Sequence, residues 1–247
     1  MKKIGIGYEE YKRFIDDDMY YIDKTMLIND IVEKGGEVTL FTRPRRFGKT
    51  LALSMLRTFF ELEYDRDGND IDKKRYFEGK KIMGASDKIL SMMGKYPVIK
   101  LSLKSAKQPG FMAAFKKLRD EIIGEFRRHA YLWQSDKLLK EEREMLEELS
   151  RPAKDDELIV KEKREMEIER YSTALKTLSE CLNKFHDKKV IILLDEYDVP
   201  LENAYYNGFY DEMVGFIRSL FESALKTNDA LQFGVVTGCL RISKESI

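Results

Sequence analysis

The stretch "FTRPRRFGKT", Phe41 to Thr50, decides which fold this chain of 247 residues is expected to adopt. It ends in Gly48-Lys49-Thr50, the last part of the pattern G-x-x-x-x-G-K-[ST], in which backbone N–H groups at the start of a helix surround a phosphate. Arg43 stands where that pattern has its first glycine. The alternative is an arginine-rich surface turn followed by an ordinary helix, in which Gly-Lys-Thr occurs by chance.

The residues on either side of this loop predict a strand before it and a helix after it. Glu37 to Thr42 suit a buried strand. After the loop, one helical face carries the apolar residues Leu51, Met55, Leu56, Phe59 and Phe60. Upstream, a short helix begins near Asp23 or Thr25 and ends at Gly35-Gly36. A phosphate loop requires the order strand, loop, helix, so this context argues against a chance match.

A second, independent signal is "VIILLDEYD", Val190 to Asp198. A continuous apolar run of this kind is typical of a buried parallel strand. Asp195, at its end, can hold Mg²⁺ through the water shell of the ion, and Glu196 can orient or deprotonate an attacking water. A strand end that simply meets solvent is the alternative explanation for this acidic pair.

Two further apolar segments predict strands, one at residues 98–103 and one from Phe233 to Val236. Strands separated by helices favour a parallel sheet in a three-layer α/β domain. Thr237 follows the last of these strands, where its hydroxyl can contact an outer phosphate or its water. Threonine is also a common strand residue, so a purely structural role stays open.

Residues 111–171 predict a helical insertion that becomes increasingly charged and is interrupted at Arg151-Pro152. Each of its last two helices carries a narrow apolar stripe, made of Leu138, Leu139, Met145 and Leu146 in the first and of Ile159, Val160, Met166 and Ile168 in the second. A solvated insertion with a packed inner face and a partner-binding arm both fit this pattern.

The composition allows one sizeable core and limits the partners. Lys+Arg and Asp+Glu are each 44, so the chain has no net charge to attract duplex DNA or an anionic membrane as a whole. No aromatic-basic platform is visible, and we expect no direct nucleic-acid binding. The longest apolar run, Val190 to Leu194, is too short to span a bilayer, so a cytoplasmic protein is expected.

The cysteines and histidines do not have metal-site spacing. Cys181 and Cys239 lie far apart, and His129 and His186 are the only two histidines. A zinc or iron–sulfur site is therefore not expected, and both cysteines are predicted to be reduced core residues.

Four segments together resemble the AAA-ATPase-like family of bacterial and archaeal P-loop proteins. They are "YYIDKT", "FTRPRRFGKTLALSMLRTFF", "VIILLDEYDVPLENAYYNGFYDE" and "LKTNDALQFGVVTGCLRISKESI". In that family R-P-R-R-F-G-K-[ST] is the usual form of the phosphate loop, so the resemblance implies that Arg43 is a family trait. Pro44 fixes its own φ and so stiffens a turn that lacks the first glycine.

The resemblance covers about Ile6 through Ile247 and is weakest across the charged middle helices. It implies one P-loop NTPase domain over residues 1–247, of the type with an additional strand between the lysine strand and the acidic strand. Here that strand would be Phe233 to Thr237.

The resemblance also implies roles for individual residues. ATP would be bound by Arg43, Pro44, Arg45, Arg46, Phe47, Gly48, Lys49, Thr50 and Leu51, with Arg241 as a further phosphate contact. The catalytic residues would be Lys49 on the β- and γ-phosphates, Glu196 as the base and Thr237 as a sensor-like residue. Thr50 and Asp195 would hold Mg²⁺.

Family members commonly continue into a C-terminal region that often includes a restriction-endonuclease-like domain, and such folds normally have a fifth core strand. This sequence ends at "RISKESI", where that continuation is expected, so it looks truncated. The lysine strand is then expected at an uncovered sheet edge.

The sequence therefore predicts an Mg²⁺-dependent module that binds and hydrolyses ATP and passes its nucleotide state to an effector domain, another partner or further copies of itself. One alternative is a nucleotide-binding switch or scaffold that does not hydrolyse, from which Glu196 distinguishes the ATPase. The other is a P-loop kinase that acts on a small molecule.

Overall fold

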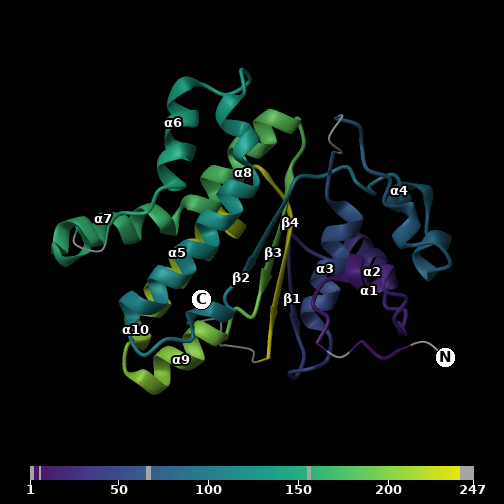
Figure 1. Cartoon of the computed structure of the whole chain (residues 1–247), viewed down its shortest axis with the longest axis horizontal. Coiled ribbons are helices and arrows are strands. Elements are labelled where there is room, and N and C mark those ends of the chain that lie inside the picture. The colour runs from purple at the N-terminus through teal and green to yellow at the C-terminus, as the bar shows by residue number, and fades with distance from the viewer. Residues whose placement is uncertain (1–2, 6, 65–67, 155–156, 240–247) are drawn as a thin grey trace.

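The computed structural model of the chain describes residues 3–5, 7–64, 68–154 and 157–239. Four parallel strands form one sheet in the order β1-β4-β3-β2. Their bounds are β1 Val38–Thr42, β2 Val98–Ser102, β3 Val190–Asp195 and β4 Leu231–Gly238. Figure 1 shows α1 to α4 on one side of this sheet and α5 to α10 on the other. The predicted three-layer α/β architecture with a parallel sheet is confirmed.

The helices differ in length between the two sides of the sheet. On the first side are α1 Tyr11–Asp16, α2 Met26–Lys34, α3 Lys49–Phe60 and α4 Asp87–Leu90. On the second side are α5 Phe111–Arg128, α6 Lys140–Leu149, α7 Lys161–Ser172, α8 Ala174–His186, α9 Val199–Asn207 and α10 Tyr210–Phe221. A π-helical turn, Glu222–Lys226, continues α10. Short 3-10 turns lie at Lys74–Tyr76, Lys81–Gly84, Lys104–Ala106, Ala130–Gln134 and Glu157–Ile159.

Strand β3 is buried along its whole length because helices cover both faces of the sheet. Successive side chains point to opposite faces. Ile191 and Leu193 pack with α1, α2 and α3 in one hydrophobic cluster. Ile192 and Leu194 pack with α5, α8 and α10 in the other. The acidic residues at the end of β3 are therefore held on a strand that is fixed from both sides.

The strand order places β4 between β1 and β3, the position that the resemblance implies for residues 233–237. Strand β1 is consequently an edge strand of the described sheet. Val38 is 39% exposed and Leu40 is 44% exposed, so the apolar side chains of this edge are only partly covered.

The middle of the chain is helical as predicted, and its apolar stripes are packed only in part. Ile159, Val160 and Met166 are exposed. Helix α7 instead buries Glu167 and Tyr171. Two polar contacts hold these side chains inside the protein. Arg119 of α5 pairs with Glu167 at 3.2 Å, and the Tyr171 hydroxyl donates to the Leu149 carbonyl at 2.9 Å.

The preceding stripe is split in the same way. Leu138 and Leu146 are buried, while Leu139 and Met145 are exposed. Helix α5 contributes eight buried residues to the core, so this part of the middle segment covers the sheet itself.

Candidate functional site

The predicted site residues that the structure describes lie at one edge of the sheet, at the carboxyl ends of the parallel strands. The loop after β1 and the acidic residues after β3 flank the end of β4. The Arg43 N–H donates to the Gly238 carbonyl at 3.1 Å, and the Tyr197 N–H donates to the Thr237 carbonyl at 3.0 Å. The end of β4 thus joins the two motifs that the sequence predicted separately.

The backbone of the loop explains why Arg43 can replace a glycine. In this loop the left-handed residues are Arg46, with φ of 70°, and Gly48, with φ of 76°. Arg43 is not among them, so its position does not require glycine. Gly48 immediately precedes α3, whose first-turn N–H groups have no partners within the helix and can bind an anion.

Lys49 is buried at the start of α3, and its ammonium group reaches back across the loop. Its Nζ donates to the carbonyls of Arg43 at 2.8 Å and Pro44 at 3.1 Å, and it lies 3.3 Å from Cys239 Sγ. The prediction that Cys239 is a core residue is wrong: it is half-buried beside the loop lysine. Cys181 is buried, as predicted.

Two of the loop arginines are engaged with the protein. The Arg43 guanidinium lies 4.9 Å from the centre of the Phe41 ring and donates to the Thr42 carbonyl at 2.8 Å. Arg45 forms a 3.2 Å ion pair with Glu202 of α9. Arg46 and Phe47 are exposed at the tip of the loop.

Asp195 and Thr237 are both buried and in direct contact. The Thr237 hydroxyl donates to Asp195 Oδ1, and the Leu103 N–H donates to the Asp195 carbonyl at 3.0 Å. The sequence placed both residues near the phosphates but did not predict this bond. Its effect is to orient the Asp195 carboxylate.

Glu196 follows directly and has a left-handed backbone, with φ of 55°. Burial raises the pKa of its carboxyl, and the negative charge of Asp195 adds to that effect, while Lys104 and Lys49 oppose it. A carboxylate with a raised pKa is a better proton acceptor near neutral pH.

Asp198 belongs to the acidic motif but was not predicted as a site residue. Asp198 is buried, and its Oδ2 accepts the Cys239 N–H at 2.9 Å. A Cβ on Gly238 would lie 2.5 Å from the Tyr197 ring and 2.8 Å from Asp198 Oδ1. Glycine is therefore needed where the end of β4 passes this turn.

The residues present fit a magnesium site that is completed by a nucleotide. Mg²⁺ prefers oxygen ligands and usually keeps waters and substrate phosphates beside one or two protein groups. The Thr50 hydroxyl and the oriented Asp195 carboxylate are groups of that kind. Within the described residues, no cluster of three or more histidine, cysteine, aspartate or glutamate side chains suited to a metal occurs. Arg241 lies outside the described residues.

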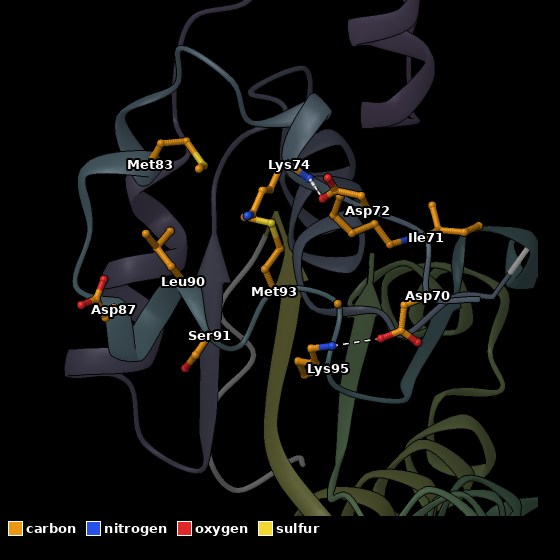
Figure 2. Close-up of a pocket in the computed structure, with 12 residues that line it drawn as sticks. Asp70, Ile71, Asp72, Lys74, Met83, Asp87, Leu90, Ser91, Met93 and Lys95 are labelled. Carbon is orange, nitrogen blue, oxygen red and sulfur yellow. Dashed lines mark hydrogen bonds and ion pairs between the residues drawn. The ribbon is translucent and has the colours of Figure 1, made fainter. Parts of the chain in front are cut away.

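A cavity of about 600 Å³ lies away from this edge (Figure 2). Its lining includes Met83, Leu90 and Met93 together with charged residues such as Lys74 and Asp87. Gly94, also in the lining, donates its N–H to Phe59 at the end of α3. The phosphate loop is at the other end of this helix, and 12 residues at about 1.5 Å each span about 18 Å. The cavity is therefore separate from the loop.

No helix in the described part of the chain has both the length and the apolar character needed to cross a bilayer.

The chain is similar to a curated protein and matches a family model. A curated protein of Azotobacter chroococcum mcd 1, described as an uncharacterized protein in the vnfD 5' region, is 25% identical over 255 residues. The similarity covers 100% of this chain and 39% of that protein, so the chain spans well under half of its relative. No solved structure matches the chain. A family model described as Predicted AAA-ATPase matches residues 5–247, and the chain therefore belongs to the predicted AAA-ATPase family.

Proposed function

We propose that this chain is an Mg²⁺-dependent module that binds and hydrolyses ATP. The observation that carries the proposal is the position of Lys49, buried at the start of α3 and in contact with Cys239, the residue directly after β4. Membership of the family supports nucleotide binding. The strand order, with β4 between β1 and β3, supports the type of P-loop fold that has an additional strand.

In this proposal the loop and the first turn of α3 bind the phosphates. Backbone N–H groups of the turn after Gly48 donate to phosphate oxygens, and Lys49 exchanges its carbonyl contacts for the outer phosphates. Thr50 and Asp195 would hold Mg²⁺, which neutralises phosphate charge when bound.

Glu196 accepts a proton from the attacking water in this scheme. Its raised pKa suits it to that role, and the hydrogen bond from Thr237 orients the Asp195 carboxylate toward the metal position. Thr237 is thus a positioning residue for Asp195.

We also propose that residues 1–247 act as one domain, with a helical insertion at about 111–171, and that the nucleotide state is passed to a further domain or partner in the cytoplasm. The support for coupling is that the relative from Azotobacter is much longer than this chain.

The test is calorimetric titration of the purified chain with ATP and Mg²⁺. Lys49→Ala is expected to weaken ATP binding at least about tenfold, since it removes a charge-assisted contact worth about 1.5–3 kcal/mol. Lys34→Ala is the control, because Lys34 is an exposed lysine of α2 that pairs with Asp30. Equal binding by Lys49→Ala, or no binding by folded wild-type chain, contradicts the proposal.

A further inference from the structure

We propose that Lys24 is a second lysine of the phosphate site, supplied by the N-terminal segment instead of the loop. This inference rests on the proposed nucleotide binding. Lys24 belongs to "YYIDKT", a segment that carries no role in the scheme above. The ligand that it would contact is the phosphate chain of the nucleotide.

The first support is the position of the ammonium group. Lys24 Nζ lies 3.5 Å from the Phe47 carbonyl oxygen. A Cβ built on Gly48 would be 3.8 Å from the same Nζ. The charge therefore stands where the loop turns into α3, next to the N–H groups that favour an anion.

The second support is that the residues on either side of Lys24 are held by hydrogen bonds. Asp23 accepts hydrogen bonds from the Thr25 N–H at 2.9 Å and from the Lys81 N–H at 2.8 Å. Thr25 is fully buried, and its hydroxyl accepts the Ile82 N–H at 3.2 Å. Both neighbours of Lys24 are thus fastened to the 3-10 turn Lys81–Gly84, while Lys24 itself is exposed.

The third support is that Lys24 has only a weak contact to lose. Within the described residues, Lys24 makes no ion pair with a carboxylate, unlike Arg45, which is held by Glu202. A contact of 3.5 Å to a carbonyl is at the long limit for a hydrogen bond, so little is given up when Nζ moves. A lysine on a flexible stem is well suited to reach a phosphate as a point charge.

The experiment is titration of wild type, Lys24→Ala, Lys24→Gln and Lys24→Arg with Mg·ATP and with inorganic tripolyphosphate. Lys81→Ala is the matched control, because Lys81 is exposed, adjoins the same segment and uses only its backbone N–H to bind Asp23. We expect Lys24→Ala and Lys24→Gln to weaken both ligands at least about fivefold, Lys24→Arg to retain most of the affinity, and Lys81→Ala to change it less than about twofold. Thermal unfolding of each variant shows that it is folded.

The outcomes separate this inference from the proposed function. If Lys49→Ala abolishes binding while Lys24→Ala and Lys24→Gln bind like wild type, the role of Lys24 is refuted and the ATP site stands. An equal loss in Lys81→Ala also refutes it, because the effect is then one of general surface charge. If the folded wild-type chain binds neither ligand, both proposals are wrong.

Discussion

Glu196 combines a left-handed backbone with a buried carboxyl whose pKa is raised. A left-handed backbone costs a residue with a Cβ about 1–2 kcal/mol, and burial next to Asp195 disfavours its ionised form. Such costs are concentrated at functional sites, where the surrounding structure enforces them. This pairing of strain and raised pKa is the reason for assigning the base to Glu196 instead of to Asp195, whose carboxylate is already bound by Thr237.

Replacing Glu196 with Gln is expected to lower ATP turnover by about 10²–10⁴ while leaving ATP binding intact. Because the base acts only when ionised, and its pKa is raised, wild-type turnover should fall with decreasing pH at a value above that of an ordinary glutamate. Steady-state phosphate release across pH measures both effects. An unchanged rate in Glu196→Gln would contradict the assignment of the base to Glu196.

Arg46 is strained in the same way as Glu196 but stands at the exposed tip of the loop. Arg46→Gly should therefore stabilise the protein by about 0.5–1 kcal/mol, after allowing for the greater freedom of glycine in the unfolded chain. Denaturant unfolding measures this change. Arg45→Gly is the matched control in the same loop: Arg45 does not have a positive φ, so its replacement should bring no gain.

At the scale of elements, the two edge strands of the sheet, β1 and β2, differ in how their edges are covered. Along β2, the Lys100 N–H donates to Glu125 Oε1 at 2.8 Å and the Val98 carbonyl accepts a bond from Arg128. Side chains of α5 thus occupy backbone groups that another strand would need. Strand β1 keeps Val38 and Leu40 partly exposed, so it is the edge better suited to pairing with a further strand.

Arg128 is central to this covering of the β2 edge, because it also pairs with Glu61 at 2.5 Å and with Glu125. Arg128→Met leaves the buried Glu125 carboxylate without its arginine and leaves the buried Glu61 with Arg57 as its remaining ion-pair partner. It is expected to lower the free energy of unfolding by about 3–5 kcal/mol. Denaturant unfolding measures the loss.

Arg151→Met is the control for this prediction, since it removes only an exposed pair with Glu147 and should cost less than about 1 kcal/mol. The double variant Arg128→Met/Glu61→Gln should recover part of the loss. Equal effects of Arg128→Met and Arg151→Met would show that the ion pairs of Arg128 at the β2 edge contribute little to the free energy of unfolding.

At the scale of the whole molecule, the two histidines make stability depend on pH. The Tyr131 hydroxyl lies 3.0 Å from His129 Nδ1 and 2.8 Å from His186 Nε2. Burial lowers the pKa of His129 to about 3, helped by the charge of Arg128 and opposed by Glu125. Burial and Lys137 lower the pKa of His186 to about 4. Both histidines are therefore neutral in the folded protein.

The unfolded chain takes up protons on these histidines below about pH 6.5, whereas the folded chain does not. Their contribution to stability is thus present above that pH and is lost as the pH falls toward 4. We expect the free energy of unfolding to drop by about 1–3 kcal/mol between pH 7 and pH 4.5.

Denaturant unfolding at the two pH values tests this, with the double variant His129→Gln/His186→Gln as the comparison. A pH dependence as steep in the double variant as in wild type would exclude the histidines as its source. Glu63, whose pKa is lowered to about 2, lies outside this window because its contribution is lost only below about pH 4.5.

The sequence by itself determined the elements and their order. The apolar run of β3 and the helical face after Lys49 are consequences of neighbouring residues, so they were predictable one segment at a time. The position of β4 between β1 and β3 was predicted from the family resemblance and agrees with the sheet.

Only the tertiary structure decided which side chains touch. Cys239 lies beside Lys49 although 190 residues separate them, Thr237 orients Asp195, and Lys24 reaches the loop from the N-terminal segment. In α7, Met166 is exposed and Glu167 is buried, because Glu167 pairs with Arg119 of α5. Such contacts depend on how helices pack against the sheet, and that packing is decided by all the elements together instead of by any one segment.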